Sequence, residues 1–207
     1  MQDFFYSYEL MVQLGVVVGT SDGEFEDSEG KVIHDWIIKT ISSYLESDDS
    51  GETLKNKLNN ALRDSYSAFE NDSLDVSAIT DGLNEFADKS VKIEAVKICM
   101  DVMAANGRWS REEIHAVRDI LTRLGFDHGE VVSIVDRKLM DIDEINDQFD
   151  IETLIGIDPF WPNAQKNLHL NQEYFKWSNR TSALSDPTEK KNVETLLGLI
   201  AGLRKKI

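Results

Sequence analysis

Five acidic side chains lie within eight residues near the N-terminus, and oxygen atoms at this density could bind a divalent cation. They are Asp22, Glu24, Glu26, Asp27 and Glu29. Hard cations such as Ca²⁺ take several oxygen ligands from a flexible loop. We therefore predict a site for Ca²⁺ or another divalent cation, with Asp22, Glu24, Asp27 and Glu29 as ligands. A solvated start of a helix is the alternative, because the N-terminal end of a helix favours acidic side chains.

The acidic stretch does not fit the EF-hand, the common calcium loop. Counting from Asp22, the sixth position should be the Gly that makes the sharp turn, and the twelfth should be a bidentate Glu. Those positions hold Asp27 and Ile33. Any cation site here must therefore have another geometry.

A second stretch, residues 105–113, repeats the pattern of residues 21–29 at an offset of 84 residues. In both, an Asp or Asn precedes a Gly, an aromatic residue follows two positions later, and a Glu lies six positions after the Gly. The second copy has Asn106, Arg108 and Arg111 where the first has three acids. We therefore expect the second copy to bind no cation.

Both stretches are also typical of corners between helices. Gly tolerates the left-handed conformation that ends many helices. Ser110 and Glu113 have the spacing of a capping box, in which each side chain accepts a hydrogen bond from a free backbone N–H. Glu26 and Glu29 hold the equivalent positions in the first copy. This structural role accounts for every residue type that the two copies share.

No combination of residues in the sequence indicates catalysis. The four histidines, His34, His115, His128 and His169, are too far apart in sequence for a local metal site. Cys99 is the single cysteine, and no neighbouring pattern marks it as a nucleophile. The chain also lacks a Gly-rich phosphate loop. We predict a non-enzymatic protein, with an enzyme whose site is assembled from distant residues as an alternative.

Charge limits the class of partner. The formal net charge is −16, and residues 1–150 carry 32 acids and 14 bases, whereas residues 151–207 carry 6 acids and 8 bases. An acidic body repels phosphate backbones, so we expect no nucleic-acid binding. The longest apolar run, Leu14 to Val18, is too short to span a membrane, and the N-terminus lacks the basic region of a signal peptide. These features favour a cytoplasmic protein.

Hydrophobic periodicity predicts an all-α fold without strands. The expected helices cover residues 4–19, 27–46, 52–70, 76–89, 90–105, 111–124, 128–140, 151–159, 163–180 and 188–206. Residues 4–19 and 90–105 are apolar nearly all round, which is typical of buried central helices. Breaks are expected at residues 47–51 and at an acidic linker, 141–147. The domains predicted are a helical bundle over 1–145 and a helical hairpin over 150–207.

Trp161, Tyr174, Phe175 and Trp177 are aromatic residues of the predicted hairpin. We expect them to form its small core and its contact with the bundle. A patch of exposed aromatic side chains that binds a protein partner is the alternative.

The run Gly19-Thr20-Ser21-Asp22-Gly23-Glu24, followed by Glu29 and an amphipathic helix, resembles the turn of the TerB-like tellurite-resistance family. The N-terminal domain of DjlA-type membrane co-chaperones is similar. The resemblance implies an all-helical bundle of two pseudo-repeats, a role in stress response or tellurite resistance, metal binding through acidic residues, and no enzymatic activity. It transfers only Asp22, Glu24 and Glu29, since Asn106 departs from the acidic pattern.

The C-terminal part resembles a J domain. Leu154-Ile155-Gly156-Ile157-Asp158 is similar to the opening of such domains, and two long helices follow in the same order. J domains need a His-Pro-Asp tripeptide between those helices to stimulate their chaperone ATPase, but residues 179–187 lack it. The resemblance therefore implies a degenerate J-like domain in an adaptor or sensor. A co-chaperone acting on an ATP-driven heat-shock chaperone is the alternative.

Overall fold

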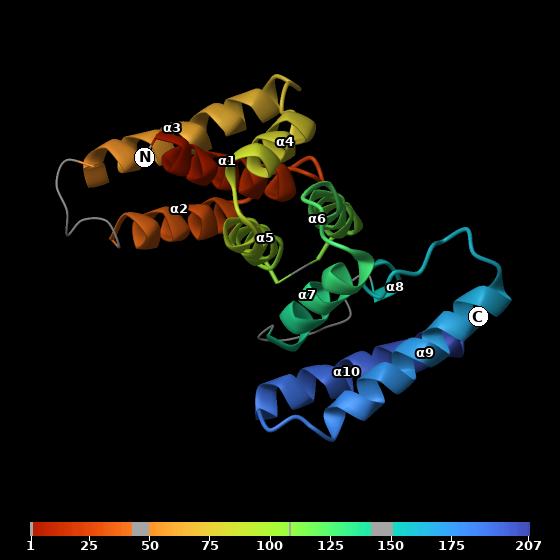
Figure 1. The fold of residues 1–207 in the computed structure, drawn as a ribbon. Coiled ribbons are helices and arrows are strands. Elements are labelled where there is room, and N and C mark those ends of the chain that lie inside the picture. Colours follow the sequence, from red (N-terminus) through yellow and green to blue (C-terminus); the bar gives the residue numbers. More distant parts are fainter. Residues whose placement is uncertain (1, 43–49, 108, 142–150) are drawn as a thin grey trace.

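A computed structural model describes residues 2–42, 50–107, 109–141 and 151–207, and these are all-α, as predicted (Figure 1). Within these ranges the chain forms ten helices and no strand. They are α1 (Gln2–Gly19), α2 (Asp27–Ser42), α3 (Ser50–Glu70), α4 (Val76–Phe86), α5 (Lys89–Met103), α6 (Arg111–Arg123), α7 (His128–Asp141), α8 (Ile151–Leu154), α9 (Asn163–Thr181) and α10 (Pro187–Arg204).

Helix α1 is the centre of the bundle. It packs against α2, α3, α4, α5 and α6. Met11, Leu14 and Val18 on this helix are fully buried. A helix surrounded on all sides cannot keep a polar face, which explains why its sequence is apolar nearly all round.

Several boundaries differ from the sequence prediction. The break expected at residues 47–51 is wrong in part, because Ser50 and Gly51 belong to α3, while residues 43–49 lie outside the described ranges. The helix expected over 76–89 ends at Phe86, since Asp88 starts α5 by accepting hydrogen bonds from the backbone N–H groups of Ser90 and Val91. A side-chain cap of this kind favours a new helix over continuation. Of the predicted linker, Asp141 is the last residue of α7, and 142–147 are not described.

The C-terminal hairpin has the expected order of a short helix and two long ones. Helix α8 is only four residues long, and α9 and α10 run antiparallel along each other (Figure 1). The loop between them is shorter than predicted, because Asn179 lies in α9 and Pro187 is the first residue of α10. Pro suits this position, where its missing N–H is not needed.

A buried ionic network joins the hairpin to α7. Asp136 on α7 is 5% exposed, and its carboxylate lies 3.2 Å from the Lys176 Nζ and 2.9 Å from a terminal nitrogen of Arg180, both on α9. Lys176 also pairs with Glu173 at 2.5 Å. The ring of Trp177, which is fully buried, lies 4.9 Å from both cations. The two ion pairs between α7 and α9 therefore share one buried carboxylate, while α7 packs against α10.

No helix in the described part of the chain is both long and apolar enough to span a membrane.

Candidate acidic site at the two turns

The two repeated turns have the same backbone structure. Gly23 N–H donates to the Thr20 carbonyl at 3.0 Å, and Gly107 N–H donates to the Ala104 carbonyl at 3.2 Å. Both glycines have positive φ, +94° and +70° respectively. The offset of 84 residues read from the sequence thus relates two structurally equivalent corners, the first between α1 and α2 and the second between α5 and α6.

The positive φ at Gly107 gives a direct test of this corner. A Cβ at this position would meet nothing within 4 Å, so replacement by Ala adds only the cost of the left-handed conformation. We expect Gly107→Ala to lower the free energy of unfolding by about 1 kcal/mol in urea denaturation. Gly198→Ala is the matched control, because its Cβ also has open space but lies within α10, and we expect a gain of about 0.5–1 kcal/mol. Equal changes in the free energy of unfolding at Gly107 and Gly198 would contradict a left-handed conformation at Gly107.

Each turn ends in a buried glutamate that caps the next helix. Glu29 Oε2 accepts a hydrogen bond from the Glu26 backbone N–H at 2.8 Å, and Glu113 Oε2 accepts one from the Ser110 N–H at 2.8 Å. The Ser110 hydroxyl completes the predicted capping box by accepting from the Glu113 N–H at 3.1 Å. Both glutamates are 1% exposed, which is unusual for an acidic side chain.

The buried glutamate pair, Glu29 and Glu113, lies where acids of the two turns act on one another. Burial is the main cause that raises the pKa of Glu29 to about 7, and the charge of Glu113 raises it further. Burial likewise raises the pKa of Glu113 to about 7, with added repulsion from Asp22 and Glu26. The repeat therefore produces one shared acidic site rather than two separate ones.

One oxygen of this pair has unmet bonding capacity. Glu113 Oε1 is buried and has no hydrogen-bond partner among the described residues. A buried, ionised carboxylate oxygen without a partner has an unfavourable desolvation free energy. Binding a proton or a cation removes this penalty. The chemistry available to the site is therefore the reversible binding of a positive charge near neutral pH.

The predicted ligands take different positions at this site. Glu29 is buried as described, whereas Asp22, Glu24 and Asp27 are exposed. The Asp22 carboxylate accepts a hydrogen bond from the Glu24 N–H at 3.1 Å. Among the described residues, no group of three or more His, Cys, Asp or Glu side chains is arranged to hold a metal ion. The cation site stays a prediction, and it would need the side chains of the first turn to move.

Sequence reasoning missed Glu113 as a member of the site. The sequence prediction assigned the second turn no cation site and gave Glu113 only a capping role. Arg108, one of the bases on which that prediction depended, lies outside the described residues. The signal was present, because the offset of 84 residues places Glu29 on Glu113. What the sequence does not give is that the two glutamates are both buried and close enough for the charge of Glu113 to raise the pKa of Glu29.

The cysteine and the histidines whose surroundings the structure describes do not support the alternative of an enzyme. Cys99 is fully buried, and burial raises the pKa of its thiol well above the usual range, which keeps it protonated. His34 and His115 are exposed. His169 Nε2 lies 2.6 Å from the Ile155 carbonyl oxygen, and its ring packs edge-on against Trp161. These contacts fix the start of the hairpin.

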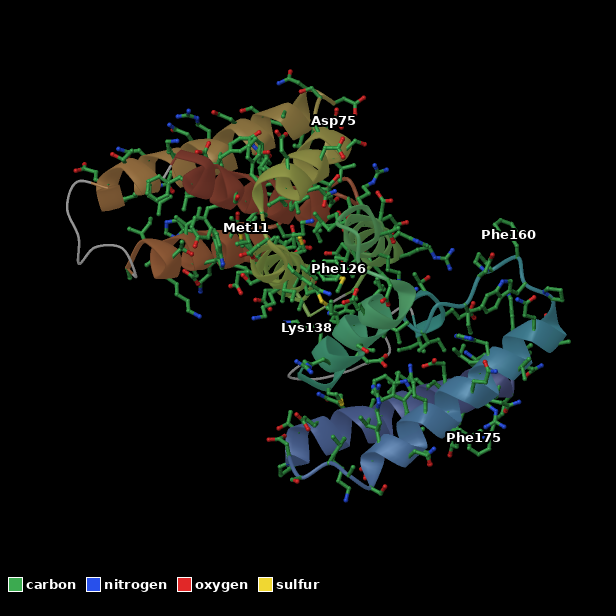
Figure 2. All side chains as sticks on the ribbon, in the orientation of Figure 1. Met11, Asp75, Phe126, Lys138, Phe160 and Phe175 are labelled. Atoms are coloured by element: carbon green, nitrogen blue, oxygen red, sulfur yellow. The ribbon has the colours of Figure 1, made fainter. Side chains whose placement is uncertain are left out.

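The aromatic residues of the hairpin divide between core and surface. Trp177 is buried, and Trp161 and Tyr174 are half-buried. Phe175 on α9 is 67% exposed, and Phe160 in the loop before α9 is 92% exposed (Figure 2). The prediction that these residues form the hairpin core is therefore correct for Trp177 and wrong for Phe175.

Comparison with known proteins finds one family for part of the chain. Residues 39–136 match the model of the tellurite resistance protein TerB family. No curated protein and no solved structure matches. The match ends before the hairpin, so the J-like character of residues 150–207 stays a prediction. The stretch from the end of α2 to α7, including the second of the two turns, is thus similar to TerB.

Proposed function

We propose that this protein is a non-catalytic adaptor or sensor of a tellurite-resistance-like stress response, and that Ca²⁺ or another divalent cation controls it at the acidic site. The observation that supports the cation most directly is Glu113 Oε1, a buried carboxylate oxygen without a partner among the described residues. The match of residues 39–136 to TerB supports the tellurite-resistance-like role.

In this proposal the buried glutamate pair supplies the innermost oxygens. Asp22 and Glu26 are exposed acids whose charges act on both glutamates, and of the two we propose Asp22 as the next ligand. Glu24 and Asp27 complete the site only after their side chains turn inward from solvent. Flexible coordination of this kind suits Ca²⁺ better than Mg²⁺, which demands near-ideal octahedral geometry.

Calorimetric titration with Ca²⁺ at pH 7.5 tests the proposal. We expect saturable binding and a rise in thermal stability, because a ligand that binds only the folded state stabilises it. Glu113→Gln should weaken binding at least about tenfold, the effect of losing one charged ligand worth about 1.4 kcal/mol. Glu112→Gln removes an exposed charge one residue away and should change affinity little.

Three outcomes decide the matter. Absence of heat and of any thermal shift in the wild type would end the cation proposal. Equal loss of affinity in Glu112→Gln and Glu113→Gln would show only general electrostatic attraction. Unchanged affinity in Glu113→Gln would move the ion to another place on the chain.

The adaptor role requires a surface for a protein partner, and α9 offers one. Its outer side carries Leu168 at 59% exposure and Phe175, and Phe160 projects from the preceding loop (Figure 2). The other exposed residues of α9 are uncharged: Asn163, Ala164, Gln165, Gln172, Ser178 and Asn179. A helix face without charges, in a chain with 29% charged residues, favours a partner that buries apolar side chains. The co-chaperone alternative is disfavoured because the loop 182–186 lacks His-Pro-Asp.

A further inference from the structure

A cavity of about 420 Å³ lies between α5 and α7. Its lining from α5 is Ile93, Lys97, Met100 and Asp101, and its lining from α7 is Ser133, Ile134, Arg137 and Lys138. This volume is within the range of small-molecule sites in proteins. Ile93 is 37% exposed, so apolar surface at this cavity is open to solvent.

The charges of this cavity are opposite to those of the body around it. It has three bases and one acid, although residues 1–150 carry more than twice as many acids as bases. Lys138 (labelled in Figure 2) pairs with Asp101 at 2.5 Å, and Lys97 pairs with Glu94 at 3.4 Å. Arg137 is exposed and forms no ion pair within the described residues. One guanidinium therefore remains available at the edge of an apolar cavity.

We propose that this cavity binds a small amphipathic carboxylate, with its aliphatic chain among Ile93, Met100 and Ile134 and its head group on Arg137. Apolar side chains take the chain out of water, which stabilises the complex in proportion to the area buried. The guanidinium matches a carboxylate through two parallel hydrogen bonds, a geometry that an ammonium group lacks. The surrounding negative field disfavours multiply charged anions, so a single carboxylate is the head group that fits.

Decanoate is the probe, and two-dimensional NMR of the isoleucine and methionine methyl groups is the measurement. We expect saturable shifts at Ile93, Met100 and Ile134, with an affinity of roughly millimolar or tighter. Decan-1-ol tests the head group and acetate tests the chain, and each should bind at least about tenfold more weakly than decanoate. Binding of decanol equal to that of decanoate would overturn the role of the carboxylate.

Arg137→Ala tests the anchoring residue without removing any described ion pair. We expect it to weaken decanoate binding about tenfold and to leave decanol binding unchanged. Arg63→Ala is the control, because it removes the same charge from an exposed site on α3. Equal effects of the two substitutions, or no saturable shift in the wild type, would overturn the proposal.

Discussion

Replacement of Asp136 by Ala is expected to lower the free energy of unfolding by about 3 kcal/mol. The Asp136 carboxylate is 5% exposed and is the shared partner of Lys176 and Arg180. Its removal leaves both cations partly buried, with Glu173 as the one remaining acid of the network. The charge on Arg118 would also become less favourable. Burial lowers the pKa of its guanidinium, and the negative charge of Asp136, which opposes that effect, would be gone.

The measurement is urea denaturation combined with hydrogen exchange of α9 and α10. We expect exchange to rise first in these two helices, since Asp136 pairs with two residues of α9, and α9 packs along α10. Asp119→Ala is the matched control, because Asp119 also pairs with an arginine, Arg123, but at an exposed site on α6. Exposed pairs contribute about 0.2–1 kcal/mol. Similar losses in the two variants would show that burial adds nothing to the Asp136 network.

An all-apolar replacement separates the cost of a broken pair from the value of the network. Asp136→Leu combined with Lys176→Met and Arg180→Met removes all three charges together. Buried ion pairs are often replaced by apolar residues without loss of stability. We therefore expect the triple variant to recover most of the free energy of unfolding that Asp136→Ala loses.

The all-α fold was predictable because its signals are local. The apolar surface of α1 indicates a buried helix, and the caps at Asp75 and Ser110 act within three or four residues. Helix boundaries failed where two local signals competed. At residues 86–89 the helical pattern continues across Asp88, but the Asp88 side chain caps a new helix and ends the old one.

Only Glu29 of the buried glutamate pair was predictable from the sequence, because the contribution of Glu113 arises from tertiary packing. Local spacing identified Glu29 as one of five clustered acids. Glu113 has no acidic neighbours on its turn except Glu112, so density of charge did not mark it. Its role depends on how α1 and α5 pack, because in the folded chain the charges of acids in one turn raise the pKa of a glutamate in the other. The same limit applies to Asp136, whose partners lie 40 and 44 residues further along the chain.

The buried glutamate pair should make the protein more stable in mild acid than at alkaline pH. Both glutamates have an ordinary pKa of 4.5, which folding raises to about 7. A raised pKa means that the folded state holds protons more tightly than the unfolded state. The resulting stabilisation is complete below about pH 4.5 and is lost as the pH rises through about 7. From pH 5.5 to pH 8 we expect a loss of about 2–4 kcal/mol from the pair.

The Glu29→Gln and Glu113→Gln variants isolate this effect from that of the other acids. Gln keeps an oxygen that accepts the capping hydrogen bond, but it cannot ionise. In EDTA, which removes divalent cations, we expect Glu113→Gln to raise the free energy of unfolding by about 1–2 kcal/mol at pH 8 and to change it little at pH 5. Glu24→Gln, at an exposed position in the first turn, should leave the pH dependence as in the wild type. If Glu113→Gln destabilised the protein equally at both pH values, the capping role of this glutamate would outweigh its burial. Stability should then not respond to the proton or the cation at this site.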